Sequence, residues 1–232
     1  MLRPIMLSTA IVAVLATPAL ADSRSFTVAP FSQASISSAI SAEITVGGPQ
    51  SIVVENATAS ALNTLRVTVV DGRLKVWRER GFLDHFTLED QALNLKITVP
   101  ALTRIDADSA STVSATGITG DKVEVNAGSA ASVSIDGLVT KAATISASSA
   151  ATITLSGSCE VAEVVLSSAG TIHGPAFECV DLDVTASSSA RGVLFASGQV
   201  NGVASSAAYV ELYGDPDHVD DEISSGADID VH

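Results

Sequence analysis

The hexapeptide Gly-Ser-Ala-Ala-Ser-Val at residues 128–133 decides the fold of this chain, because its pattern occurs seven times after residue 100. Each copy has a small pair centred on serine, two variable positions, and then Val or Ile. The serines that anchor the copies are Ser109, Ser129, Ser149, Ser168, Ser189, Ser206 and Ser225. Their spacing is nearly constant along the chain, so the sequence predicts a repeat architecture.

Apolar and polar residues alternate after every anchor. The fourth residue after each anchor is Val or Ile, namely Val113, Val133, Ile153, Ile172, Val193, Val210 and Ile229. The sixth is apolar or small, and the residue between them is mostly polar or small, which is the period of a strand with one buried face. A small residue eight positions after the anchor, such as Gly117 or Gly137, marks a turn. Coils of about 20 residues with short strands form a parallel β-helix, so we predict an all-β solenoid over residues 101–232.

The core of such a solenoid has to be thin. Aromatic residues make up 4% of the chain and apolar residues 47%, so Val, Ile, Leu and Ala must fill it. Stacked coils bury one another's apolar residues, and Ile153, for example, is predicted to lie between Val133 and Ile172. Tight, stacked turns explain the many serines, none of which has the local His or carboxylate signature of a nucleophile.

Residues 22–100 follow the pattern of β-hairpins. Alternating runs such as 65–69 and 73–77 are separated by turn residues, here Asp71-Gly72, which is a strong hairpin signal. We interpret this part as irregular first coils and hairpins that cap the N-terminal end, because an open stack must avoid edge pairing with other chains. Residues 22–232 then form one continuous domain.

The N-terminal segment, residues 1–21, has the features of a secretory signal peptide. Arg3 provides an early positive charge, residues 11–15 are apolar, and Ala19-Leu20-Ala21 is a small-residue exit. The apolar stretch is shorter than the roughly 20 residues of a membrane span, so we expect cleavage before Asp22 and no transmembrane anchor in the mature chain. The chain is expected to be exported, either to the periplasm or out of the cell. No cysteine precedes residue 159, which excludes a lipid-modified cysteine at the cleavage point.

The charge of the chain argues against nucleic acid as a partner. Twelve Lys and Arg residues against 26 Asp and Glu residues give a formal net charge of −14. Phosphate binding requires a basic face, so we expect no contact with nucleic acid. No motif in the sequence indicates a cofactor.

The small-residue repeats and several further stretches resemble the head-GIN domain family of auto-transporter adhesins. The stretches are Phe31-Ser32, Asp71-Gly72-Arg73-Leu74, Ile-Thr-Val-Pro-Ala-Leu at 97–102, and Tyr213-Gly214-Asp215-Pro216. The resemblance covers nearly all of the mature chain and implies a single-stranded right-handed β-helix of the bacterial envelope without an agreed activity. The family usually has Ser-Gly-Ala-Ser in its turns, whereas here the glycine is mostly Ser or Ala, as in Ser148-Ser149-Ala150.

Paired carboxylates are the candidates for catalysis. Asp106 and Asp108 share one strand with Asn126 stacked over Asp106, and Asp181 and Asp183 form a similar pair. Two such acids can hydrolyse a glycosidic bond. The repeat region has few aromatic or basic residues to hold an acidic sugar, so a solvated strand edge is the better interpretation. We therefore expect no enzymatic activity.

Acidic residues also crowd the last loop between coils. They are Asp215, Asp217, Asp220, Asp221 and Glu222. Clustered carboxylates can bind Ca²⁺, but the residue order of known calcium loops is absent, so we favour a solubilising end. The four histidines are far apart in the sequence and predict no metal site.

One basic and aromatic cluster is a candidate ligand-binding patch in this acidic chain. It contains Arg73, Lys75, Trp77, Arg78 and Arg80. Such a patch could bind an anionic glycan or a protein partner. The alternative is a hairpin with a solvated outer face, which the alternation of charged and apolar residues favours.

The only two cysteines, Cys159 and Cys179, are separated by the length of one coil. Adjacent coils lie about 4.8 Å apart, within the range of Cα distances that a disulfide accepts. Cys159 follows its anchor serine by ten positions and Cys179 by eleven, so a displacement by one residue could place them on opposite faces. Export to an oxidising compartment favours the disulfide.

The leading functional hypothesis is a non-catalytic, exported β-helical module that acts as an adhesin or interacts with the cell envelope. A carbohydrate-active β-helix, which binds or cleaves polysaccharide, is one alternative, and it would need convergent acids and aromatics in a groove. A structural periplasmic spacer is another, and it would bind nothing in a glycan or envelope pull-down.

Overall fold

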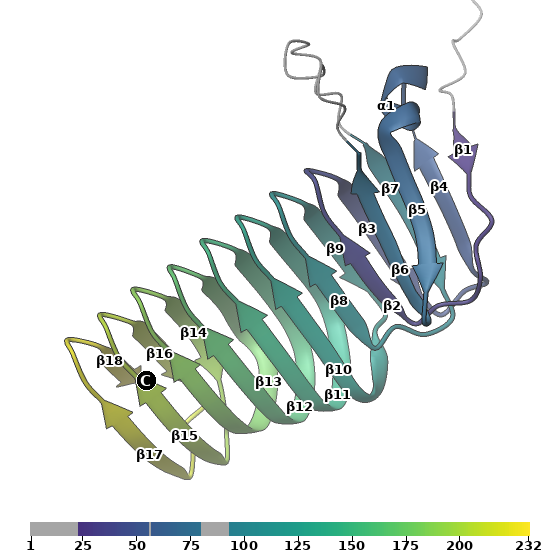
Figure 1. Ribbon diagram of the computed structural model, residues 1–232. Helices are drawn as coiled ribbons and strands as arrows, with labels where there is room; N and C mark the ends of the chain where they lie inside the picture. Colours follow the sequence, from purple (N-terminus) through teal and green to yellow (C-terminus); the bar gives the residue numbers. More distant parts are fainter. Residues whose placement is uncertain (1–22, 56, 80–92) are drawn as a thin grey trace, which may run out of the picture.

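The protein is a β-solenoid in the computed structural model, which describes residues 23–55, 57–79 and 93–232 (Figure 1). Eighteen strands form one continuous sheet that winds around a single apolar core, as predicted. The only helix in the described ranges is α1, Ala59–Thr64, so none there is long and apolar enough to cross a membrane. The expected signal peptide, residues 1–21, and Arg80 lie outside the described residues.

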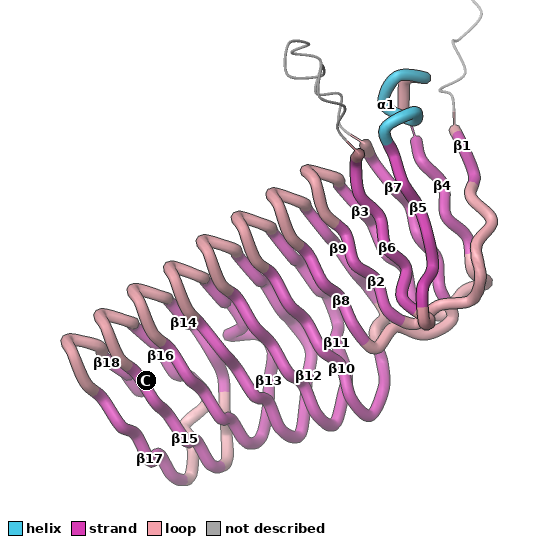
Figure 2. Tube along the Cα trace, viewed as in Figure 1, coloured by secondary structure: helices cyan, strands magenta, loops and turns pink. Residues whose placement is uncertain are grey.

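Each coil of the repeat region has one strand segment before its serine turn and one after it. Both segments pair in parallel with the equivalent segments of the neighbouring coils. Along the chain the strands are β8 (Arg104–Ala107), β9 (Thr112–Thr116), β10 (Thr119–Ala127), β11 (Ser132–Ala147), β12 (Thr152–Leu166), β13 (Thr171–Ala186), β14 (Arg191–Phe195), β15 (Gln199–Ala204), β16 (Tyr209–Tyr213), β17 (His218–Ile223) and β18 (Asp228–Val231). The serine turns line up along one edge of the stack, as the pink segments in Figure 2 show. Ile153 is fully buried and lies in register between Val133 and Ile172, which confirms the predicted ladder there.

Each serine turn places two successive residues in the left-handed region of backbone conformation. In one turn, φ is 52° at Ser149 and 60° at Ala150, and the N–H of Ala151 donates to the carbonyl oxygen of Ser148 at 3.1 Å. Fifteen of the sixteen left-handed residues in the eight turns of this kind are Ser or Ala, and only one is Gly. Because this conformation costs a non-glycine residue about 1–2 kcal/mol, the turns must be stabilised by their neighbours in the stack.

One coil is displaced by one residue from its predicted alignment. Its turn is formed by Ser188 and Ser189, so the anchor is Ser188 and not Ser189. As a result Gly192 is buried opposite Ile172, whereas Val193, which was predicted to belong to the ladder, is only half-buried. Three consecutive serines at this turn make the two alignments indistinguishable in the sequence pattern.

The N-terminal part contains a coil that the repeat pattern did not reveal. β2 (Gln33–Ile36) and β3 (Ser41–Val46) flank the eighth turn of the left-handed kind. β2 pairs in parallel with β6 (Arg73–Arg78) and with β8, while β3 pairs in parallel with β7 (Asn94–Val99) and with β9. The first coil in the sequence therefore lies between two coils built from later segments.

Antiparallel strands lie at this end of the stack (Figure 1). β5 (Leu65–Val70) forms with β6 the hairpin that Asp71-Gly72 predicts, and β4 (Ser51–Glu55) pairs with β7 and with β1 (Arg24–Ser25). The position of these strands supports the proposal that residues 22–100 cap the solenoid.

Cys159 and Cys179 lie opposite each other on β12 and β13 and form a disulfide, with their Cα atoms 4.4 Å apart. The register between the two strands shifts by one residue after Thr154. This shift cancels the one-residue difference in the distances of the two cysteines from their anchor serines, so both face the same side.

Candidate ligand-binding face

Hydroxyl groups line the outer side of the four successive strand segments that follow the serine turns at the starts of β9, β11, β12 and β13. We define the hydroxyl face as Thr112, Ser114, Ser132, Ser134, Thr152, Thr154 and Thr171. The alternation of the strands produces this face, because Val113, Val133 and Ile153 point into the core and the residues on either side of them point outward.

The hydroxyl groups form two columns that run along the axis of the solenoid. Thr112, Ser132, Thr152 and Thr171 form one column, and Ser114, Ser134 and Thr154 form the other. Neighbouring strands are about 4.8 Å apart and alternate residues of a strand about 6.6 Å apart, so the groups have a regular two-dimensional spacing. The register shifts of these strands begin only after Ile135 and Thr154, beyond the face.

The hydroxyl groups of this face are free to bind a ligand. None of the seven has a hydrogen-bond partner in the part of the chain that the structure describes. Six of these residues are exposed and Thr171 is half-buried. Each hydroxyl group can donate one hydrogen bond and accept others, so a ligand could bind here without breaking an internal bond.

A shallow groove borders the hydroxyl face at the end formed by β3 and β7. Its volume is about 290 Å³, and its walls include Thr112 and Ser114 together with Glu43 and Lys96. The ammonium group of Lys96 lies 3.2 Å from the carboxylate of Glu55. The groove is therefore continuous with the hydroxyl face, and its charges are partly neutralised by this ion pair.

Aromatic side chains lie at the other end of the same sheet. Tyr209 continues the column of Thr171 two coils further on, and the ring of Tyr213 stacks on that of His232 with centroids 4.9 Å apart. Partial desolvation and the carboxylate of Glu211 raise the pKa of both tyrosines above the usual value of about 10, so both stay protonated at neutral pH. No motif in the sequence marks these aromatics as a group, because only the alignment of coils brings them together.

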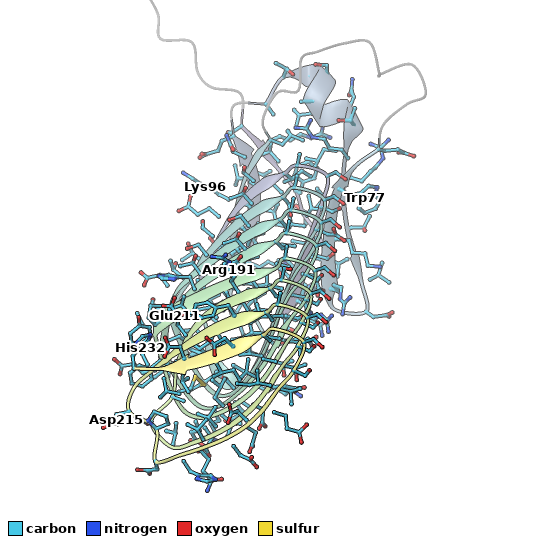
Figure 3. All side chains as sticks on the ribbon, turned by 90° about the vertical axis from the view of Figure 1, so that its left-hand side faces the viewer. Trp77, Lys96, Arg191, Glu211, Asp215 and His232 are labelled. Carbon is cyan, nitrogen blue, oxygen red and sulfur yellow. A yellow bond between two sulfur atoms is a disulfide. The ribbon has the colours of Figure 1, made fainter. Side chains whose placement is uncertain are left out.

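Strand alternation divides the predicted basic and aromatic patch. Arg73, Lys75 and Trp77 alternate with the buried core residues of β6, whereas Arg78 lies on the other face of the strand. Figure 3 shows Trp77 on the opposite side of the stack from Lys96, so this patch is separate from the hydroxyl face.

Asp106, a candidate catalytic acid, belongs to an ion-pair network. Its carboxylate accepts hydrogen bonds from Nε of Arg104 and from Asn126, each at 2.9 Å, and lies 3.5 Å from a guanidinium nitrogen of Arg73. Arg104 also contacts Glu124 at 2.6 Å, and the hydrogen bond to Asp106 raises the pKa of Arg104. The predicted stacking of Asn126 over Asp106 is confirmed, and these bonds hold neighbouring coils together.

The other paired acids also make structural bonds. The carboxylate of Asp108 accepts a hydrogen bond at 2.6 Å from a backbone N–H of its own turn. Asp181 accepts the N–H of Gln199 at 2.9 Å, and Asp183 accepts the side-chain amide of Asn201 at 2.7 Å. The bonds of Asp181 and Asp183 link two successive coils, whereas the bond of Asp108 stays within its own turn.

The five acids of the last loop are distributed over β17 and the residues that precede it. Asp215 and Asp217 precede β17, and Asp220 and Glu222 lie on its outer side, whereas Asp221 faces inward opposite the buried Gly202. Within the described ranges no group of three or more His, Cys, Asp or Glu side chains is placed to share a metal ion. An inward-pointing charge on an edge strand opposes pairing with another chain, and the solubilising role of this loop stays a prediction.

The fold and the exposed face define a class of protein, the β-solenoids that present an extended surface formed by many coils. Within this class the chain belongs to the family described as "putative auto-transporter adhesin, head GIN domain", whose family model matches residues 30–216. The family resemblance in the sequence is thereby confirmed.

Solved structures share this fold over most of their length. A "putative adhesin" from Bacteroides fragilis has a TM-score of 0.80 at 13% identity, over 91% of this chain and 95% of that one. A "putative adhesin" from Parabacteroides merdae has a TM-score of 0.66 at 14% identity, over 91% and 96% of the two chains. A "putative lipid binding protein" from Parabacteroides distasonis has a TM-score of 0.66 at 13% identity, with the same coverage. At such identities the likeness shows the fold alone, and a comparison with curated proteins found no match.

Proposed function

We propose that the protein is an exported, non-catalytic adhesin-like module that attaches to the cell envelope or to another surface through its hydroxyl face. The observation that carries this proposal is the set of seven unpaired hydroxyl groups, held in register by buried strands. Rigid, pre-organised groups lose little entropy when a ligand binds, so such a face suits attachment.

Two further features support the proposal. The family name describes adhesins, and residues 1–21 have the pattern of an export signal. The carboxylates that could have served catalysis make structural hydrogen bonds, as Asp106 does with Asn126 of the next coil.

Co-sedimentation of the purified, exported chain with intact bacterial cells and with envelope fractions tests the proposal. We expect saturable binding. The variant Ser114→Lys with Ser134→Lys puts two long charged side chains into the middle of the face and should reduce binding strongly.

The matched control is Ser146→Lys with Thr185→Lys, which adds the same charge to the strand segments on the other side of the serine turns and should bind as the wild type does. The proposal fails if the wild-type chain shows no saturable binding, or if the two charged variants lose binding equally.

A further inference from the structure

We infer that the ligand of the hydroxyl face is an extended, neutral polysaccharide that lies along the solenoid axis. This inference rests on the proposed function and names the class of ligand. Three features support it. They are the two columns of the hydroxyl face (the strip), the groove at one end of this strip and the aromatic side chains at the other end.

The chemistry of the strip matches that of a sugar polymer. Every position of its two columns from Thr112 to Thr171 carries a hydroxyl group, apart from His173, which follows Thr154 in the second column. A polysaccharide presents hydroxyl groups at regular intervals, and one sugar unit of an extended chain is close in length to the spacing between neighbouring strands. Several weak contacts that repeat in this way add up to a useful affinity.

The charges around the strip select against an anionic polymer. The seven side chains of the hydroxyl face carry no charge, although the whole chain has a net charge of −14, and His173 is the titratable side chain within its two columns. Charged residues begin only at its borders, and Figure 3 shows Lys96, Arg191 and Glu211 along the same side of the stack. A neutral ligand avoids the repulsion that the acidic chain would exert on a polyanion.

The two ends of the strip supply contacts of a different kind. The groove lined by Glu43 and Lys96 offers charged hydrogen-bonding groups beside Thr112. At the other end Tyr209 and Tyr213 offer flat apolar surfaces with a polar tip, which suit the C–H face and the edge hydroxyls of a sugar ring. A protein partner would need a few large anchors in a buried pocket, and the strip of small side chains provides none.

Affinity electrophoresis of the exported chain tests the inference. Native gels that contain hydroxyethylcellulose or glucomannan should retard the wild-type chain, whereas gels with the polyanion polygalacturonate should not. The variant Thr152→Val with Thr154→Val removes two hydroxyl groups and keeps the β-branched shape, and it should weaken the retardation about tenfold, because repeated contacts act together. Tyr209→Ala should also weaken it.

The control is Thr144→Val with Thr185→Val, which makes the same change in the strand segments on the other side of the serine turns and should leave the retardation unchanged. Circular dichroism melts of all variants establish that they are folded. The inference is overturned if no neutral polysaccharide retards the folded wild-type chain, or if both valine pairs have the same effect. Suppose that the chain co-sediments with envelope fractions, but that neutral glycans neither retard it in the gel nor compete with this binding. Then the inferred polysaccharide ligand is wrong, whereas the proposed attachment through the hydroxyl face stands.

Discussion

The backbone N–H of Ala150 donates to the carbonyl oxygen of Ser168, one coil further along the stack, at 3.0 Å. Equivalent bonds join all eight serine turns, from the N–H of Ala39 to the carbonyl oxygen of Ser225. The turns therefore form a hydrogen-bonded ladder of their own. This ladder offsets the cost of the left-handed backbone, so small non-glycine residues can occupy it.

A β-branched residue in this ladder should destabilise the protein. Ala150→Val places a branched side chain at a φ of 60°, where it is strongly disfavoured, so we expect a loss of about 1–3 kcal/mol in the free energy of unfolding. Urea denaturation measures the loss. The control Ala142→Val makes the same change at a half-buried strand position, where Val is favourable, and should not destabilise. Equal losses in both variants would contradict the role of the turns.

An aspartate in the apolar ladder should collapse the stack around it. Ile153 is fully buried between Val133 and Ile172, so Ile153→Asp buries an unpaired carboxylate and should cost at least about 3 kcal/mol. Thr152→Asp, one residue away on the exposed face, is the matched control and should have little effect. A loss below about 1 kcal/mol for Ile153→Asp would argue against the stacked alignment.

The disulfide between Cys159 and Cys179 should contribute to stability by closing a loop one coil long. The double variant Cys159→Ala with Cys179→Ala should lose about 3 kcal/mol relative to the oxidised wild type in the chain-entropy treatment. Reduction of the wild type should lower its stability similarly. Thiol titration of the denatured, unreduced chain provides the direct test, and two free thiols in exported material would contradict the bridge.

The ion-pair network around Arg104 should stabilise the coils at the N-terminal end. Arg104→Met leaves the carboxylates of Asp106 and Glu124 without their shared cation and should cost about 1–2 kcal/mol, less at high salt. Lys141→Met removes the exposed pair with Asp121 and should have no measurable effect. Urea denaturation of both variants at low and high salt compares the Arg104 network with the exposed Lys141–Asp121 pair. An equal loss of stability in the two variants would contradict a stabilising role of the network.

Local patterns predicted most of the coils. The recurring serines predicted the seven turns after residue 100, one of them with an anchor displaced by one residue, and the alternation predicted the burial of Ile153. The separation of Cys159 and Cys179 by one coil length allowed them to meet but left a one-residue displacement open. The place of the β2–β3 coil could not be predicted in this way. It depends on contacts such as that between Ser32 and Thr103, which are 71 residues apart.

The candidate site was harder to predict than the fold. Thr152 and Thr154 are visible in the sequence as the polar partners of Ile153, but any solvated strand face has such partners. That no other segment within the described ranges bonds to their hydroxyl groups is a property of the whole structure. Tyr209 and Tyr213 were missed because they belong to one late coil, and only the stacking of coils places them on the same sheet as Thr171.

The position of the β2–β3 coil between two later coils has a consequence for how an exported chain assembles. A chain that crosses a membrane N-terminus first delivers residues 33–46 early, but we expect their strand edges to stay unpaired until the partner strands β6, β7, β8 and β9 have followed. A single coil buries too little to be stable alone, so we expect this end to fold only after residue 116, halfway along the chain, has crossed. From then on each new coil finds a finished edge to pair with. The first step of assembly therefore comes late and needs three separate segments of the chain. Each later step adds one coil in the same direction and needs only the segment that forms this coil.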